Sequence, residues 1–285
     1  MPHQLTRCLT LIVVLIFCTC CRQDSNAGAP PFTVLWWNLE WFPGHKPGKV
    51  EPEEAQAHFD AVFRELKEQQ PDVLLLSEIK TENDAQRLAG ALGMRLDLFT
   101  HFKGAQEIAI LSRHGAEAVH FEEFVTSRDG TTPPRGLVFG AFRHGRRLVL
   151  AYGCHLKSNR GGSLPDNITK REEAARQMIA HIQRSLMQEF RDSGPVAVVV
   201  AGDFNTDPFQ ADFRSERTLA IFREAGFSEP LATLPAESRW TWRSDGRFPN
   251  ACFDHAFTSG ATVSAAVLPT SEAASDHRPV CVTLQ

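Results

Sequence analysis

The sequence predicts one mixed α/β domain that extends from about residue 32 to residue 285. Three observations predict it. Short β-type apolar runs recur along the chain, three segments between them carry apolar residues at helical spacing, and no repeat or internal linker divides them. The length of 285 residues, with 42% hydrophobic and 22% charged residues, is that of a globular protein and not of a disordered or fibrous one. One domain of this size can bury a sizeable core.

Three segments have the pattern of amphipathic helices. Residues 52–69 place apolar side chains at three- and four-residue spacing, and they are followed by Pro71, which cannot continue a helix. A shorter helix is predicted at residues 84–92. The longest segment, residues 168–190, is amphipathic along its length and ends before Gly194-Pro195, a pair that interrupts regular structure.

The strand-like runs are short and rich in β-branched and aromatic residues. Residues 72–77 (DVLLLS) are almost continuously apolar, which is typical of a strand buried on both faces. Residues 196–201 are dominated by valine, and a tight turn at His144-Gly145 is expected to join two neighbouring strands. The predicted strands are residues 32–37, 72–77, 108–112, 137–142, 147–154, 196–201, 240–242, 252–258, 261–268 and 280–284.

Residues 1–21 have the organisation of a secretory signal peptide. Arg7 supplies a basic start, residues 8–17 are almost wholly apolar, and small or thiol residues follow. The apolar run is shorter than the roughly 20 residues that a transmembrane helix needs. The sequence therefore predicts export, to the periplasm, the outer membrane or the extracellular space.

The end of the apolar run also resembles a degenerate bacterial lipobox, with Cys20 or Cys21 as the residue that would carry the lipid. Lipidation would tether the protein to a membrane, whereas ordinary cleavage would release it, and the sequence leaves both open. Residues 22–31 (RQDSNAGAPP) are small, polar and rich in Pro and Gly, as in a flexible tether. The folded domain is then predicted to span residues 32–285.

Charge and cysteine content exclude two classes of protein. With 30 basic and 34 acidic residues, the net charge of −4 provides no strongly basic surface of the kind that binds nucleic acid non-specifically. Any chemistry on a polyanion must therefore depend on a local site. Beyond the leader the chain keeps Cys154, Cys252 and Cys281, an odd number within or beside apolar runs, so a disulfide framework is not predicted. No grouping of cysteines and histidines has the spacing of a zinc site.

Polar residues recur at the ends of the strand-like runs. They are Asn38, Glu78, His155, Asp203 with Asn205, Asp254, and Asp276 with His277. Because strand ends at one edge of a sheet converge, we expect these residues to line one cleft. Any one of them has an ordinary structural explanation, such as a turn or a surface pair. Six such occurrences together are harder to dismiss.

The chemistry of this set points to hydrolysis of an anionic substrate. Carboxylates and amides without thiolates suit a hard cation, Mg²⁺ or Mn²⁺, better than zinc. Histidines beside carboxylates suit general acid–base catalysis near neutral pH. Lys80, Arg135 and Lys157 lie near such positions and can hold a phosphate group. The residues therefore indicate a metal-assisted hydrolase that activates water.

Six motifs extend over nearly all of the mature chain. They are WWNLEWF (36–42), LLLSEIK (74–80), YGCHLKSN (152–159), AGDFNTDP (201–208), FDHAF (253–257) and SDHRPV (275–280). In this order they resemble the endonuclease/exonuclease/phosphatase superfamily, whose fold is that of deoxyribonuclease I. The resemblance implies a four-layer α/β/β/α sandwich, in which two packed mixed β-sheets are flanked by helices. HLKSN and the helix start that follows it look most like the bacterial secreted or envelope nucleases.

By position, the resemblance implies a metal site and a general base. The implied metal ligands are Glu78, Asn38 and Asp276. His277 resembles the base that deprotonates the attacking water, and Asp254 resembles the carboxylate that orients its ring. His255 follows Asp254 on the predicted strand, so it is expected to face the opposite side.

Other positions are implied to contact the substrate. Asp203 and Asn205 resemble the pair that holds the nucleophile and the phosphate oxygens. His155 resembles a general acid or phosphate donor, and Glu107 resembles a carboxylate that pairs with this histidine. The further substrate-binding candidates are Arg135, Lys157 and Asn159.

The preferred interpretation is an exported, metal-dependent nuclease that acts on DNA or RNA as a monomer. The alternative is a phosphatase or sphingomyelinase-like phosphodiesterase that acts on a small-molecule or lipid phosphoester through the same site. Thr206-Asp207-Pro208 departs from the inositol polyphosphate phosphatase branch, and no apolar hairpin like that of the sphingomyelinase branch is evident. The sequence leaves open Mg²⁺ or Mn²⁺, an additional Ca²⁺ site, and endo- or exonucleolytic cleavage.

Overall fold

The computed structural model describes residues 30–103 and 106–285. The predicted signal peptide at residues 1–21, the candidate lipidation sites Cys20 and Cys21, and all but the last two residues of the tether predicted at 22–31 lie outside the described residues. Within the described part of the chain, no helix combines the length and the apolar character that a membrane span requires.

The strands form two mixed sheets. The first has the order β10-β11-β1-β2-β4-β3 and the second the order β5-β6-β7-β8-β9. The first sheet contains β1 (Phe32–Phe42), β2 (Val73–Ile79), β3 (Arg95–Phe99), β4 (Glu107–Ser112), β10 (Val263–Val267) and β11 (Val280–Leu284). The second contains β5 (Ala118–Glu123), β6 (Gly136–His144), β7 (Arg147–His155), β8 (Val196–Asp203) and β9 (Asp254–Ser259). In each sheet one pair is parallel, β1 with β2 and β7 with β8.

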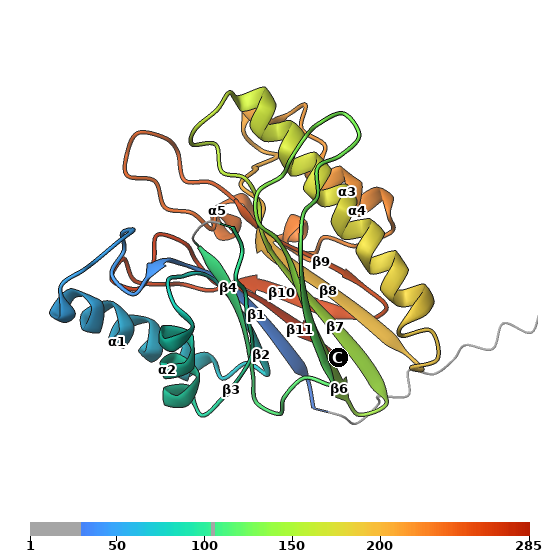
Figure 1. Cartoon of the computed structure of the whole chain (residues 1–285), viewed down its shortest axis with the longest axis horizontal. Helices are drawn as coiled ribbons and strands as arrows, with labels where there is room; N and C mark the ends of the chain where they lie inside the picture. The colour runs from blue at the N-terminus through green and yellow to red at the C-terminus, as the bar shows by residue number, and fades with distance from the viewer. Residues whose placement is uncertain (1–29, 104–105) are drawn as a thin grey trace, which may run out of the picture.

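Helices cover the outer face of each sheet. The helices are α1 (Pro52–Gln69), α2 (Glu82–Leu92), α3 (Leu164–Gln188), α4 (Thr218–Glu224) and α5 (Ala236–Arg239), with short 3₁₀ turns at Ala211–Phe213 and Pro230–Thr233. Figure 1 shows α1 and α2 along one side of the molecule and α3 and α4 along the opposite side, with the strands between them. The expected four-layer α/β/β/α sandwich is confirmed.

The central strands alternate between two cores. On β1, Val34 and Trp36 belong to the core between the two sheets, whereas Leu35 and Trp37 belong to the core under α1 and α2. Successive side chains of a strand point to opposite faces, and here both faces are covered. A strand buried in this way is apolar at almost every position, which explains continuous runs such as residues 72–77.

Cap residues set the helix starts that the apolar pattern does not predict. The helix predicted at residues 52–69 has these bounds in the structure, but α2 and α3 begin earlier than expected. Thr81 accepts a hydrogen bond from the N–H of Asp84 at 3.2 Å, and Ser163 accepts one from the N–H of Asp166 at 3.3 Å. These side chains satisfy backbone donors that have no partner inside the helix.

One predicted strand is wrong, and two observed strands have no counterpart in the prediction. Residues 240–242 form no strand, because Trp242 makes only isolated bridges, to Ala251 and His277. The unpredicted strands β3 and β5 lie at the edges of their sheets. Their half-exposed side chains interrupt the apolar pattern on which the prediction depends.

Candidate active site

The predicted site residues lie where neighbouring strands end. The register pairs His155 with Asp203 and Asp203 with Asp254, so β7, β8 and β9 place these three residues in one row across the second sheet. In the first sheet, Asn38 on β1 pairs with the residue that precedes Glu78 on β2. Residues from both sheets therefore meet at one edge of the sandwich, as the sequence pattern predicts.

The amide of Asn38 joins the two sheets. Its Nδ2 donates to Glu78 Oε1 and to Asp203 Oδ2, each at 3.1 Å. Its Oδ1 accepts from the backbone N–H of Glu40, also at 3.1 Å. Asn38, Glu78 and Asp203 are all buried, so the amide holds one carboxylate from each sheet at a set separation.

Glu78 has a strained backbone. Its φ of +61° lies in the left-handed region, at the point where β2 breaks register between Ser77 and Ile79. A residue other than glycine pays on the order of 1–3 kcal/mol for such a conformation, which persists only where its surroundings enforce it. The Glu78 carboxylate is held by Asn38 and by the backbone N–H of Trp41, which donates to Oε2 at 3.1 Å. Strain of this kind is common at functional sites.

Asp254 and His277 form a buried pair beside this bridge. His277 Nδ1 lies 2.7 Å from Asp254 Oδ2, and Trp36 Nε1 donates to Asp254 Oδ1 at 2.8 Å. The backbone N–H of Asp254 donates to the Thr241 hydroxyl at 2.8 Å. Both oxygens of the carboxylate are therefore engaged, and the orientation of the His277 ring is set by the carboxylate.

The second nitrogen of His277 faces other acidic groups. Its Nε2 lies 3.9 Å from Asp203 Oδ2 and 3.9 Å from Asp276 Oδ1. Asp276 is oriented by Trp242 Nε1, which donates to Oδ2 at 2.9 Å, and by Glu40 Oε2, which accepts from its backbone N–H at 3.1 Å. A water or phosphate oxygen between these groups would be within reach of Nε2.

The carboxylates raise the pKa of His277 and are themselves perturbed. Burial alone lowers the pKa of His277, but the charges of Asp254, Asp276 and Asp203 outweigh it and hold the pKa well above its usual value. Burial and the neighbouring Asp254 raise the pKa of Asp203 to about 7. Burial likewise raises the pKa of Glu78 and of Asp276. These raised pKa values show that the buried carboxylates are incompletely neutralised by nearby positive charge. A bound cation would supply that charge.

The donor set fits a hard divalent cation. The expected ligands Glu78, Asn38 and Asp276 offer oxygen atoms and no thiolate, as Mg²⁺ and Mn²⁺ prefer. Asp203, Asp254 and His277 form a group of possible ligands whose ligand atoms lie within 4.8 Å of one another. Asp254 lies 2.7 Å from His277 Nδ1 and accepts from Trp36 at its other oxygen, so we assign that carboxylate to the histidine. The carboxylate of Asp203 lies 3.9 Å from Nε2 of the same ring and accepts from Asn38 and from the N–H of Asn205.

His155 is buried in the same site, but its expected partner is different. Its Nε2 lies 3.6 Å from Asp203 Oδ2 and 3.9 Å from Glu78 Oε1. Burial, together with the charges of Arg135 and His277, lowers its pKa well below the usual value, so the ring is neutral. The predicted pairing of Glu107 with His155 is not the contact that the structure shows.

Glu107 instead makes structural hydrogen bonds next to the end of β2. Its Oε2 accepts from the Thr100 hydroxyl at 2.6 Å and from the backbone N–H of Phe102 at 3.0 Å. It lies at the start of β4, opposite Ile79 of β2, so it supports the irregular end of the strand that carries Glu78. The register break at this edge is not visible in the sequence, so the sequence does not indicate that Glu107 contacts Thr100 and Phe102.

The three substrate-binding candidates donate hydrogen bonds to backbone carbonyl oxygens of the loops around the site. Arg135 donates to the carbonyl oxygens of His155 and Leu156, at 2.7 and 2.5 Å. Its guanidinium is close enough to the charges of Asp203 and Glu78 for them to act on its pKa, which burial lowers. It therefore contributes positive charge to the site from a fixed position.

Lys157 and Asn159 are engaged in the loop that follows β7. Lys157 Nζ donates to the carbonyl oxygens of Ser158 and Arg160, at 2.7 and 2.5 Å. Asn159 Nδ2 donates to the carbonyl oxygen of Asn205 at 3.0 Å. These contacts fix the segment that contains Asn205 and do not by themselves assign either side chain to the substrate.

Asn205 lies directly beside Asp203, as its motif predicts. Its backbone N–H donates to Asp203 Oδ1 at 2.9 Å, and its Nδ2 donates to the carbonyl oxygen of Leu156 at 3.3 Å. Its φ of +53° is left-handed. Asn tolerates this conformation better than most residues, which gives a local reason for Asn at this turn.

His255 faces away from the site, as predicted. Its Nδ1 lies 3.1 Å from Glu229 Oε1 and its Nε2 lies 3.0 Å from the carbonyl oxygen of Thr206. Sequence reasoning missed Trp36 and Ser275 as supporting residues. Ser275 donates to the carbonyl oxygen of Asn38 at 2.7 Å and accepts from the N–H of His277 at 2.9 Å. The only sequence signal for this role is the position of Ser275, two residues before His277.

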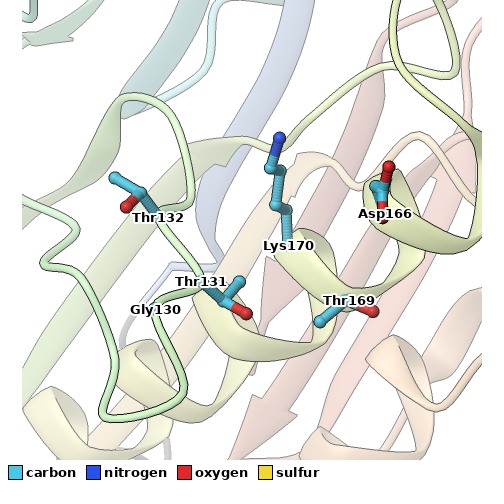
Figure 2. Close-up of a pocket in the computed structure, with 6 residues that line it drawn as sticks. All are labelled: Gly130, Thr131, Thr132, Asp166, Thr169 and Lys170. Atoms are coloured by element: carbon cyan, nitrogen blue, oxygen red, sulfur yellow. The ribbon is translucent and has the colours of Figure 1, made fainter.

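A separate cavity of about 390 Å³ lies between the loop that joins β5 to β6 and the first turns of α3. Its lining consists of Gly130, Thr131, Thr132, Asp166, Thr169 and Lys170. Figure 2 shows the loop segment with Thr131 and Thr132 beside the turns of α3 that carry Asp166, Thr169 and Lys170. The cavity is polar with one lysine, and none of the predicted site residues lines it.

Comparison with known families gives one match that covers most of the chain. The sequence profile described as the Endonuclease/Exonuclease/phosphatase family matches residues 35–277. No curated protein matches the chain by sequence.

Solved structures share the fold at low identity. The human Nocturnin catalytic domain with bound sulfate anion has 16% identity and a TM-score of 0.65, over 90% of this chain and 95% of that one. Danio rerio TDP2 complexed with single strand DNA product has 16% identity and a TM-score of 0.62, over 90% and 99%. An endonuclease/exonuclease/phosphatase family protein from Bacteroides thetaiotaomicron has 18% identity and a TM-score of 0.62, over 90% and 98%. At this identity the likeness establishes the fold.

Proposed function

This chain belongs to the endonuclease/exonuclease/phosphatase family, and we propose that it is a metal-dependent phosphodiesterase that cleaves DNA or RNA with a water activated by His277. The observation that carries the proposal is the buried pair of Asp254 and His277, 2.7 Å apart, whose free ring nitrogen faces the carboxylates of Asp203 and Asp276. A base, an orienting carboxylate and a cation site within one buried edge are the parts that phosphoester hydrolysis requires.

In this mechanism Asp254 holds the Nδ1–H tautomer of His277, which leaves Nε2 to accept a proton from water. Asp203 lies 3.9 Å from this nitrogen and can orient the water between them. Asn205 is fixed beside Asp203 by its backbone hydrogen bond, and its Nδ2 donates to the carbonyl oxygen of Leu156. The base therefore comes from the segment before β11 and the water-positioning groups come from the end of β8.

The metal and the phosphate-facing groups complete the site. A Mg²⁺ or Mn²⁺ ion held by Glu78, Asn38 and Asp276 would supply positive charge to the phosphoryl oxygens and lower the pKa of nearby groups. Neutral His155 can donate a hydrogen bond to a phosphate oxygen, and buried Arg135 adds a fixed positive charge. The positive charge of the metal ion would also lower the pKa of His277 from its raised value. A base needs this lower pKa, because its ring must be neutral before it accepts a proton.

Nucleic acid is the preferred substrate for two reasons. A similar fold occurs in the structure of Danio rerio TDP2, which was complexed with single strand DNA product. The chain also departs from the inositol polyphosphate phosphatase pattern at Thr206-Asp207-Pro208. A net charge of −4 does not oppose this proposal, because a divalent ion supplies the local field that a basic surface would otherwise provide.

Export and tethering are part of the proposal and rest on the first 31 residues of the sequence. We propose an exported monomer, either released or anchored through lipid on Cys20 or Cys21. Fractionation of cells that express the full chain, with metabolic labelling by a lipid precursor, distinguishes the two. Label that survives replacement of both cysteines, or protein found only in the cytoplasm, would contradict the proposal.

The substrate test uses the purified protein, stripped of metal, beside Glu78→Gln. Supercoiled plasmid, single-stranded DNA, RNA and a panel of small and lipid phosphoesters are each incubated with Mg²⁺, Mn²⁺, Ca²⁺ or chelator. We expect cleavage of nucleic acid that requires the metal and is lost in Glu78→Gln. Metal-dependent release of phosphate or headgroup from the panel, without nucleic-acid cleavage, would instead support the phosphatase or sphingomyelinase-like alternative.

A further inference from the structure

Three metal-ligating side chains lie together on the outer face of the second sheet, away from the active site. His120 and Glu122 project from the edge strand β5, and His181 projects from α3, which covers that face. The ligand atoms of these three residues lie within 4.8 Å of one another. Residues two apart on a strand point to the same side, so β5 presents both of its ligands to the helix.

His181 is held in the orientation of a metal ligand. The ring is buried, with an exposed fraction of 4%, and its Nδ1 lies 3.3 Å from the Tyr152 hydroxyl. Its Nε2 lies 3.8 Å from Glu122 Oε2. A partner on one ring nitrogen fixes the tautomer and directs the other nitrogen toward the metal in histidine metal sites. Here the Tyr152 hydroxyl, which can accept from Nδ1–H, is that partner, and the other nitrogen faces Glu122.

We propose that His120, Glu122 and His181 bind a zinc ion. Two imidazoles and one carboxylate form a donor set that zinc takes, with a fourth position left for water. Bonds of about 2.0–2.1 Å require the ligand atoms to approach one another to roughly 3.4 Å. His120 is exposed and the Glu122 side chain is 45% exposed, so both can turn toward the buried ring without disturbing the core.

Arg184 is the competing partner of Glu122. It lies one turn after His181 on α3, and its NH2 donates to Glu122 Oε2 at 3.2 Å. The Arg184 side chain is 47% exposed, and an exposed ion pair of this kind contributes little to stability. Zinc binding therefore displaces the guanidinium into solvent at small cost.

The ion would join β5 to α3 next to an existing contact. Gln177 on α3 exchanges two hydrogen bonds with the backbone of Val125, at 2.9 and 2.8 Å. Val125 lies near the start of the loop that joins β5 to β6. This loop contributes one wall of the cavity in Figure 2 and ends at Arg135 in the active site. The zinc site would thus anchor the start of a loop whose end contributes charge to catalysis.

The test measures zinc binding by calorimetry on the metal-stripped protein and on four variants. His120→Ala and Glu122→Gln remove ligands, Glu78→Gln alters the active site, and His101→Ala removes another exposed histidine as the matched control. We expect one zinc equivalent in the wild type, in Glu78→Gln and in His101→Ala. Affinity for that equivalent should fall by roughly tenfold or more in His120→Ala and Glu122→Gln.

A second readout does not depend on affinity. Co²⁺ in a site with two histidines should give visible absorption bands in the wild type and in Glu78→Gln, and these bands should be absent in His120→Ala. Circular dichroism without metal checks that each variant is folded. Equal zinc uptake and equal spectra in His120→Ala and the wild type would overturn the proposal, as would uptake lost in Glu78→Gln alone or no zinc uptake by the wild type.

Discussion

Two buried pairs of histidine and carboxylate lie on opposite faces of β9. Asp254 faces the active site and holds His277 Nδ1 at 2.7 Å. The next residue, His255, faces the other way and lies 3.1 Å from Glu229. In each pair burial lowers the pKa of the histidine, but the acidic partner outweighs burial and raises it.

The two pairs differ in the second ring nitrogen. Nε2 of His255 lies 3.0 Å from the carbonyl oxygen of Thr206, so both of its nitrogens have fixed protein partners. Nε2 of His277 has acidic oxygens no closer than 3.9 Å among the described ion-pair contacts, those of Asp203 and Asp276. A buried pair is therefore not by itself a sign of catalysis. What distinguishes the catalytic candidate is a nitrogen that faces a space bounded by groups able to hold water and phosphate.

The largest effect is expected from Asp254→Asn. The amide no longer enforces the tautomer of His277 or stabilises its charged form, so kcat for metal-dependent cleavage should fall by roughly 10²–10⁴-fold, with a smaller change in KM. Steady-state rates on the preferred substrate measure this. Activity close to that of the wild type would mean that Asp254 only supports the fold.

Glu229→Gln on the opposite face should affect stability and leave activity within about twofold. The change removes the charged partner of buried His255, and we expect a loss of about 2–3 kcal/mol in the free energy of unfolding. Denaturant unfolding at about pH 6, below the ordinary pKa of 6.5, measures it. The raised pKa of His255 means that its contribution is present below its ordinary pKa and lost as pH rises through the folded value. A large loss of kcat in this variant would remove the distinction between the two pairs.

His58 adds a third case, because both nitrogens of this buried ring face backbone groups. Burial, with the charge of His45, lowers its pKa from 6.5 to about 4. Its Nδ1 accepts from the N–H of Gly44 at 2.7 Å and its Nε2 lies 2.8 Å from the carbonyl oxygen of Ala274, which is the pattern of a neutral ring.

Between these two pKa values the unfolded chain binds a proton that the folded protein excludes, so stability must fall as pH decreases from about 6.5 toward 4. We expect His58 to contribute a loss of about 2 kcal/mol between about pH 7 and pH 5. The comparison of wild type with His58→Gln by thermal or denaturant unfolding isolates this slope. Parallel pH profiles for the two proteins would show that His58 does not exclude the proton.

Trp36→Phe is expected to have the smallest effect on the active-site pair. It keeps most of the apolar volume but removes the indole N–H that donates to Asp254 Oδ1 at 2.8 Å. The rate should fall about tenfold, as for a hydrogen bond to a charged group. If the fall matched that of Asp254→Asn, the orientation of the carboxylate would matter as much as its charge.

The sequence predicts the fold and the convergence of the polar strand ends, for a physical reason. Strands buried on both faces produce apolar runs that end sharply, and polar residues such as Glu78 and Asp203 stand at those ends. The expected four-layer arrangement and the opposite orientations of Asp254 and His255 are confirmed, because both follow from alternation along a strand.

Contacts between side chains are harder to predict. Trp36 belongs to an apolar run, and nothing in that run indicates that its N–H reaches Asp254. The partner of Glu107 depends on a break in the register of β2, and edge strand β5 lacks the apolar pattern altogether. The cluster on β5 and α3 joins His120 to His181 across a long stretch of sequence, so no spacing motif reveals it.

The most direct test of the central claim compares His277→Ala with His255→Ala in one assay. Both variants and the wild type are purified, checked for folding, and assayed for plasmid nicking at saturating Mg²⁺ or Mn²⁺. We predict that His277→Ala loses roughly 10²–10⁴-fold in rate, whereas folded His255→Ala stays within about twofold of the wild type. Equal losses in the two variants, or wild-type nicking by His277→Ala, would contradict the assignment of His277 as the base.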